Sequence, residues 1–305
     1  MNSWLRVSSS VQAAIARGRP LVALESSVLA QGLLPPHNRD AAERMVAAIE
    51  ERGAAPAITA IVRGVATVGL ESDELERFLQ RDNVRKVSAR DLAHAMATFA
   101  DGATTVAGTL AICVAAGMQV FATGGIGGVH RDAPYDESAD LAELARSPVI
   151  VVCAGAKSIL DLPATVERLE TSGVTVVGYR TNDLPGFFTQ KTGIKLDLAV
   201  DSASEIAAIW THHRALNRPG AILVMQPPPA EFALAPALVE QATAAALRQS
   251  KEKGVRGAAV TPFLLSEIQR LTNGRSVVAN LALLEANAAL AADIAIALHE
   301  PLASS

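Results

Sequence analysis

Hydrophobic residues in this chain gather in short runs, and longer stretches of mixed polarity separate them. Runs of a few residues rich in Val, Ile, Leu and Ala are too short for helices and are typical of buried parallel strands. They predict strands at 21–25, 57–62, 66–68, 84–88, 120–122, 149–153, 174–179 and 221–225. Their alternation with helical stretches predicts a single α/β domain over residues 1–305, a three-layer α/β/α sandwich with a mostly parallel central sheet.

The intervening stretches predict helices, and polar residues at their starts predict the caps. Helices are expected at 8–18, 38–52, from 72, from 88 or 91, and at 104–116, 158–172, 201–213, 236–253, 261–271 and 276–298. Asn38 and Ser72 are the predicted caps of the second and third helices. No capping box is expected after Ser72, because the residue three positions later is Leu75.

Composition excludes several classes of protein. Half of the 305 residues are hydrophobic, yet the apolar run 288–298 is interrupted by Asp293 and falls short of a membrane span. The first ten residues lack the apolar core of a signal peptide, so we expect a cytoplasmic protein with no membrane partner. A net charge of −4 and 4% aromatic residues argue against a nucleic-acid partner. Cys113 and Cys153 lack metal-ligand spacing and are expected as reduced thiols, Cys153 in the core.

Two of the predicted strands end in turns that carry polar chemistry. Strand 120–122 is followed by the glycine turn 124–128 and then by His130 and Arg131, and strand 149–153 is followed by Lys157. Ligands of open α/β sheets bind outside the carboxyl ends of the strands. Glycines are needed both in structural turns and where a backbone approaches a phosphate, and the adjacent basic pair favours an anion site.

Three charged residues near strand ends are candidates for catalysis or binding. Lys157 lies between a buried strand and a helix, where a desolvated amine can form an imine, although a surface lysine is an equal alternative. Glu25 closes an apolar strand and suits either an acid/base group or an ion-pair partner. Lys86 is interpreted first as an edge-strand cation and second as a phosphate ligand.

An acidic segment lies between the two turns. Asp136, Glu137 and Asp140 offer the hard oxygen ligands that Mg²⁺ or Mn²⁺ prefers, but three carboxylates are also typical of a solvated loop or the start of a helix. The residues alone therefore predict a cytosolic enzyme that acts on a small phosphorylated or anionic substrate.

Ordered segments of the chain resemble one enzyme family. VALESSVLAQG, TAIVRGVATVGL, KVSARDL, GATTVAGT, VFATGGIGGVHR, DESADL, VVCAGAKSILDL, GYRTNDLPGFF, DSASEIA and TPFLL are similar to segments of the pseudouridine-5'-phosphate glycosidases, the indigoidine-synthase-A-like family. The resemblance covers about residues 20–290. It implies an α/β/α fold, a homotrimer, a divalent metal that is typically Mn²⁺, and reversible cleavage of the C–C glycosidic bond to give uracil and ribose 5-phosphate.

The resemblance also implies roles for particular residues. Lys157 would be the nucleophile that forms an imine with the ring-opened sugar, Glu25 the proton donor and Asp136 the metal ligand, with water completing its shell. Lys86 and His130 would hold the 5'-phosphate. The implied substrate site comprises Lys86, Val106, His130, Ser138, Ala139, Asp140 and Asn280.

Three places depart from the family's pattern. Gln31 stands where the family commonly has His, the loop at Asp132–Pro134 is changed and shortened, and Ala258-Ala259 follow Gly257 where the family has Lys-Glu. Two alternative functions stay open. One is an imine-forming lyase or aldolase on another sugar phosphate, and the other is a catalytically silent relative that binds sugar phosphates.

Overall fold

One large sheet crosses the computed structural model, which describes residues 4–131, 135–255 and 260–299. Its strand order is β1-β4-β3-β2-β7-β9-β13-β11-β12, and β6 joins β3 to β5. Its eleven strands are β1 (Leu5–Val7), β2 (Leu21–Glu25), β3 (Ala55–Val62), β4 (Val65–Val68), β5 (Val84–Val87), β6 (Asp101–Thr104), β7 (Val120–Ala122), β9 (Ile150–Cys153), β11 (Thr175–Tyr179), β12 (Ala199–Val200) and β13 (Ile222–Met225). A separate antiparallel pair consists of β8 (Val129–His130) and β10 (Leu160–Asp161).

The strands are parallel where the chain is most apolar. Every residue of β9 is buried, because β7 and β13 flank it in parallel register and helices cover both faces. The antiparallel exceptions are β4 and β6, which both pair with β3. Arg63 and Gly64 connect β3 to β4 with φ of 48° and 81°, the conformation that a tight hairpin requires. The predicted mostly parallel α/β/α architecture is confirmed.

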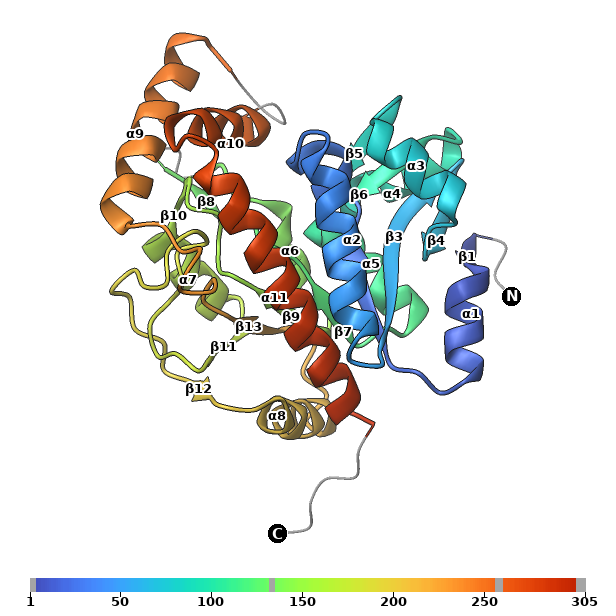
Figure 1. Ribbon diagram of the computed structural model, residues 1–305. Helices are drawn as coiled ribbons and strands as arrows, with labels where there is room; N and C mark the ends of the chain where they lie inside the picture. Colours follow the sequence, from blue (N-terminus) through green and yellow to red (C-terminus); the bar gives the residue numbers. More distant parts are fainter. Residues whose placement is uncertain (1–3, 132–134, 256–259, 300–305) are drawn as a thin grey trace.

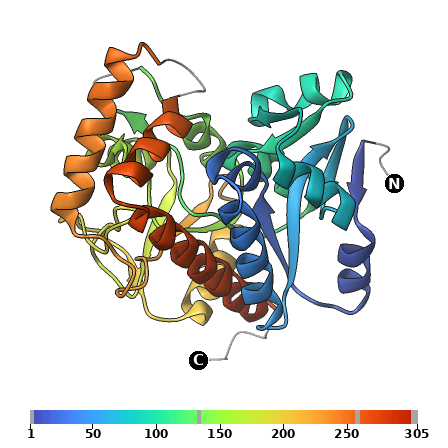
Figure 2. The same cartoon turned by 45° about the horizontal axis from the view of Figure 1, so that its top comes forward.

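Helices cover both faces of the sheet. Those after the first strand are α1 (Ser9–Ala16), α2 (His37–Glu50), α3 (Ser72–Gln80), α4 (Leu92–Ala97), α5 (Val106–Ala116), α6 (Ala139–Leu144), α7 (Leu162–Thr171), α8 (Ala203–Ala215), α9 (Pro236–Glu252), α10 (Val260–Leu271) and α11 (Arg275–Ala297). Figures 1 and 2 show α2 and α11 side by side across one face, with α5 behind the sheet. Helix α6 packs against α5, and α8 packs against α11.

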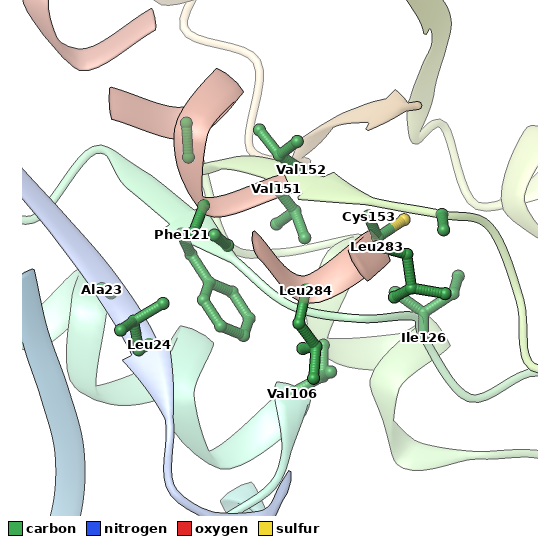
Figure 3. Close-up of a cluster of buried hydrophobic side chains, with 14 of the residues drawn as sticks. Ala23, Leu24, Val106, Phe121, Ile126, Val151, Val152, Cys153, Leu283 and Leu284 are labelled. Carbon is green, nitrogen blue, oxygen red and sulfur yellow. The ribbon is translucent and has the colours of Figure 1, made fainter. Parts of the chain in front are cut away.

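Helix α11 forms the centre of the core. Leu283 and Leu284 pack where Phe121 of β7 and Val151 and Val152 of β9 meet the helix (Figure 3). This 23-residue helix is long and apolar enough to span a membrane, so the run 288–298 understates its apolar extent. However, 67% of its apolar window is buried inside the protein, as expected of a core helix.

Two predicted helix starts are wrong. Asn38 lies inside α2, and its buried amide donates hydrogen bonds to the carbonyl oxygens of Leu29 and Leu79. The cap of α3 is Glu71 rather than Ser72. Glu71 and Glu74 form a reciprocal capping box there, which the sequence was expected to lack.

The helix expected at 158–172 is also shorter than predicted. Residues 158–161 form a turn and β10, and α7 begins at Leu162 after the Asp161 cap. Strands β1, β6 and β12 and the π-helical turn η1 (Val28–Gly32) were not predicted, because their short segments carry little periodicity. The turn η1 follows β2 directly and borders the cleft described below.

Candidate active site

A cleft opens at the carboxyl edge of the central strands and has two halves. We call one the polar half, a cavity of about 1260 Å³ that includes open solvent, lined among others by Arg90, Thr105 and His130. The other is the apolar half, lined among others by Val28, Phe187 and Leu265. The residues that line both halves are Glu25, Ser27, Lys86, Lys157 and Thr261. The two halves therefore meet at two lysines and a carboxylate.

All ten residues that the sequence assigned to a site line this cleft. Glu25, Lys86 and Lys157 lie at the junction, and Asn280 of α11 lines the apolar half. The remaining six line the polar half: Val106, His130, Asp136, Ser138, Ala139 and Asp140. The fold thus brings together residues from positions 25 to 280, as expected for side chains that follow parallel strands.

Glu25 is a buried carboxylate held from two sides. It ends β2, and its side chain is only 7% exposed. Oε1 accepts a hydrogen bond from the hydroxyl of Thr123 at 2.5 Å, and Oε2 accepts one from the hydroxyl of Ser27 at 2.5 Å. Thr123 follows β7, the parallel neighbour of β2. The carboxylate is therefore fixed in orientation at the cleft wall.

Lys157 is held by its backbone, and its amine is free. Ala156 forms a parallel bridge with Ile126, and the Lys157 N–H donates to the Ile126 carbonyl oxygen at 3.1 Å. Its side chain lines both halves of the cleft, and its Nζ has no hydrogen bond or ion pair with the described residues. An amine without a carboxylate partner is available to react with a carbonyl carbon when deprotonated.

Lys86 lies on the edge strand β5 and extends into the same cleft. Desolvation and the positive charge of Lys157 lower the pKa of the Lys86 amine, while Asp140 and Glu25 act in the opposite direction. The interpretation as an edge-strand cation is confirmed, and the side chain lines the cleft, while its role as a phosphate ligand stays a prediction. The interaction also shows that the two lysines are close enough to affect each other electrostatically.

Asp140 stabilises the loops of the polar half. It is 6% exposed, and its two oxygens accept hydrogen bonds from the N–H groups of Ala107 at 2.9 Å and Gly127 at 2.8 Å. These bonds join the glycine turn to the first turn of α5, next to Val106. Asp140 therefore shapes the polar half through backbone contacts.

The glycine turn is needed mainly for close packing. A Cβ atom at Gly127 would lie 2.2 Å from the Ser138 hydroxyl, and one at Gly128 would lie 2.4 Å from the Thr165 hydroxyl. None of the glycines at 124–128 has the positive φ that favours this residue. Of the two interpretations left open, the structure therefore supports a tightly packed turn over a phosphate cradle.

The basic pair after the turn is divided between two roles. The guanidinium of Arg131 donates to Glu240 and to the carbonyl oxygens of Ser158 and Leu160. It connects β8 to the segment after Lys157, so its expected part in an anion site was wrong. His130 alone of the pair lines the polar half.

The three acidic residues of this segment also have different partners. Glu137 forms an ion pair with Arg168 at 2.9 Å, and Asp140 is occupied by backbone N–H groups. Asp136 is exposed in the polar half, and its carboxylate has no partner in the described part of the chain. No group of three or more His, Cys, Asp or Glu side chains is placed to hold a metal among these residues. Within the described residues, a cation in the polar half would therefore meet one open carboxylate, that of Asp136, and would need water or ligand oxygens for the rest of its shell.

Several residues that line the cleft or support its wall were missed from the sequence. Ser27 and Thr123 each lie within two positions of a predicted strand end, so their location gave a signal, but their shared contact with Glu25 did not. Thr261 and Leu265 reach the cleft from α10, far from the central strands in sequence. Of the three departures, Gln31 lines the apolar half, whereas Asp132–Pro134 and Ala258-Ala259 lie outside the described residues.

Comparisons with known proteins extend over nearly the whole chain. The model of the family "Indigoidine synthase A like protein" matches residues 10–297. A pseudouridine-5'-phosphate glycosidase of Gemmatimonas aurantiaca is 65% identical over 97% of this chain and 96% of its own length. One of Staphylococcus aureus is 45% identical over 99% of both chains.

Two solved structures share the fold closely. Prealnumycin C-glycosynthase AlnA in complex with ribulose 5-phosphate has a TM-score of 0.89 and 38% identity, over 98% of both chains. An indigoidine synthase A-like protein from Thermotoga maritima has a TM-score of 0.89 and 33% identity, over 97% of both chains.

Proposed function

This chain belongs to the indigoidine synthase A-like family, and we propose that it is a pseudouridine-5'-phosphate glycosidase. It cleaves the C–C bond between ribose 5-phosphate and uracil, and the reaction is reversible. The observation that carries the proposal is the free amine of Lys157 in the same cleft as the fixed carboxylate of Glu25. The likeness to enzymes that carry this name over nearly their whole length supports it.

The chemistry requires both groups because the leaving atom is a ring carbon with no lone pair to protonate. The C1'–O4' bond breaks as the ring oxygen takes a proton from Glu25, and Lys157 Nζ supplies the electron pair for a new bond to C1'. The ammonium formed at Nζ returns a proton to Glu25, which restores the nitrogen lone pair. The nitrogen lone pair then forms a C=N bond as the C1'–C5 bond breaks, and Glu25 delivers a proton to C5 of uracil. Water hydrolyses the imine, which releases ribose 5-phosphate and regenerates the amine.

The polar half suits the phosphorylated sugar. Lys86 and His130 are its proposed phosphate ligands, and Val106 and Ser138–Asp140 its proposed sugar contacts. Cations and hydroxyls of this half, including Arg90 and Thr105, support that assignment. Asn280 is the proposed contact on the opposite side, toward the base.

Asp136 is the proposed ligand of one Mn²⁺ ion, with water completing the shell. When bound, such an ion would neutralise negative charge on the sugar phosphate. The carboxylate of Asp136, which lines the polar half and has no partner among the described residues, supports this assignment. All proton transfers proposed above use residues of the chain itself.

We also infer that the protein is cytoplasmic and, from the resemblance, that it is a homotrimer. Light scattering after size exclusion tests the assembly. The account expects a mass about three times the 31.7 kDa of one chain. A monomer would contradict it.

A turnover assay tests the function directly. Purified protein is incubated with pseudouridine 5'-phosphate and Mn²⁺, and uracil and ribose 5-phosphate are measured together. Equal release of both products is expected, and the reverse reaction should consume them equally. Cleavage of another sugar phosphate with none of pseudouridine 5'-phosphate would instead support the lyase or aldolase alternative. Binding of ribose 5-phosphate without any turnover would support the silent relative.

A further inference from the structure

Gln31 carries an unsatisfied acceptor in the wall of the apolar half. It lies in η1, directly after β2, and its Nε2 donates to the Val84 carbonyl oxygen at 3.2 Å. Its Oε1 is shielded from solvent and accepts no hydrogen bond from the described residues. A buried acceptor without a donor is unfavourable, and native structures rarely keep one without a use.

The composition of the cleft indicates which half receives the base. The apolar half is walled by Val28, Phe187 and Leu265, with the amides of Gln31 and Asn280 among them. Apolar walls with a few fixed polar groups are typical of sites for flat, neutral ligands such as a nucleobase. The polar half instead matches a phosphate. This assignment rests on the proposed function, because it takes Lys157 and Glu25 at the junction as the place where the C–C bond breaks.

We propose that Gln31 selects the leaving base by accepting a hydrogen bond from a ring N–H of uracil. A uracil attached through C5 keeps N–H groups at both N1 and N3, so it offers donors on two edges. The bond from the Gln31 amide nitrogen to Val84 leaves the oxygen as the group that needs a partner. A base that lacks the matching N–H leaves this acceptor unsatisfied and is discriminated against.

Gln31 also separates two cavities. A second cavity of about 570 Å³, lined by Leu34, Arg81 and Ser276, adjoins the apolar half, and Gln31, Leu265 and Asn280 line both. A test of the hydrogen bond should therefore keep the bulk of this partition. Gln31→Met does so, because methionine has similar length but provides no amide.

The experiment compares wild type and Gln31→Met on three substrates: pseudouridine 5'-phosphate and its 1-methyl and 3-methyl derivatives. For wild type, kcat/KM on at least one of the two methylated substrates should be about tenfold or more below kcat/KM on the parent substrate. In Gln31→Met, kcat/KM for the parent should fall about tenfold, and discrimination against that methylated substrate should largely disappear. Borohydride trapping of ribose 5-phosphate should remain at the wild-type level, since Gln31 lies in the apolar half.

Each contrary result has a distinct meaning. Wild type that cleaves all three substrates equally overturns the selection by Gln31 and leaves the proposed function intact. An equal fall for all substrates in Gln31→Met also overturns it, because a structural role affects every substrate alike. Wild type that releases no uracil from the parent substrate refutes the proposed function itself.

Discussion

The hydroxyl of Thr123 donates a 2.5 Å hydrogen bond to Oε1 of Glu25, across 98 positions of sequence. The contact exists because β2 and β7 are adjacent parallel strands that end at the same edge. Thr123 is itself fixed, since its N–H donates to Val152 and its carbonyl oxygen accepts from the buried Asn287 amide. A network from α11 through β7 thus orients the proposed proton donor.

Removing this hydroxyl should impair chemistry more than binding. Thr123→Val keeps the shape of the side chain but leaves Glu25 with Ser27 as its hydroxyl donor. We expect kcat to fall about tenfold with KM nearly unchanged. Steady-state kinetics check this, and Thr123→Ser, which restores a hydroxyl, should recover most of the loss. Equal rates in the valine and serine variants would contradict the role of the hydrogen bond.

Loss of the nucleophile should be far more severe. Lys157→Ala is expected to lower kcat by about a thousandfold or more, because the proposed mechanism has no other group that supplies the electron pair to C1'. The Lys157 amine has no partner in the described structure, so the melting temperature should stay within about 3 °C of wild type. Turnover and thermal melts measure the two effects. Substantial residual activity would rule out the proposed covalent step.

The metal proposal has a matched control in the neighbouring residue. Asp136→Ala should remove stimulation by Mn²⁺ and weaken cation binding, whereas Glu137→Gln should retain both. The difference is expected because the Glu137 carboxylate pairs with Arg168 and that of Asp136 has no described partner. Isothermal titration with MnCl₂ and ribose 5-phosphate measures binding apart from turnover. Normal cation binding by the Asp136 variant would contradict the assignment of Asp136 as the metal ligand.

Lys86 gives a pH dependence with a definite sign. Its folded-state pKa lies below the ordinary 10.5, so the unfolded chain holds this proton to higher pH than the folded protein does. The stability penalty from charged Lys86 is therefore full below its folded pKa and fades as pH rises toward 10.5. Lys86→Met should raise the melting temperature slightly at pH 7, with less gain at pH 10. The gain should stay under about 1 kcal/mol because solvent in the cleft screens the charge.

The same variant should weaken substrate binding. As the pH rises, the affinity of the wild type for phosphate should fall at a lower pH than it would with a lysine of ordinary pKa, because the pKa of Lys86 is lowered. Calorimetric titration with ribose 5-phosphate between pH 7 and 10 measures this in both proteins. A wild-type affinity that stays constant over this range would contradict phosphate binding by Lys86.

The glycine turn gives a stability prediction. Gly127→Ala should destabilise the protein by about 2–3 kcal/mol, because the new methyl group would overlap Ser138 and Asp140. Gly32→Ala is the matched control, since a Cβ there meets only ordinary contacts at 3.5 Å or more. Chemical denaturation of both variants tests the difference. If the two variants were equally stable, the turn would accommodate the additional methyl group and the prediction would be wrong.

Sequence reasoning located the site better than it described its interactions. Glu25 and Lys157 were candidates because strand ends predict where ligands bind, and the resemblance supplied the substrate-site roles of Lys86, Val106 and Asn280. The ion pair between Arg131 and Glu240 was not predictable, because the two residues are 109 positions apart in the sequence. The Thr123–Glu25 contact was not predictable for the same reason. The contribution of Thr261 and Leu265 of α10 to the cleft was not predictable either, because tertiary packing alone brings these residues there. Local caps failed where competing groups were adjacent, as with Glu71 beside Ser72.

The central claim is that Lys157 forms an imine with the sugar phosphate, and chemical trapping tests it most directly. The protein is incubated with ribose 5-phosphate and Mn²⁺, reduced with borohydride, digested and mapped by mass spectrometry. The account predicts a reduced pentose-phosphate adduct on Lys157 in wild type and none in Lys157→Ala. An adduct on Lys86 or another lysine, or no adduct despite measured binding of ribose 5-phosphate, would contradict it.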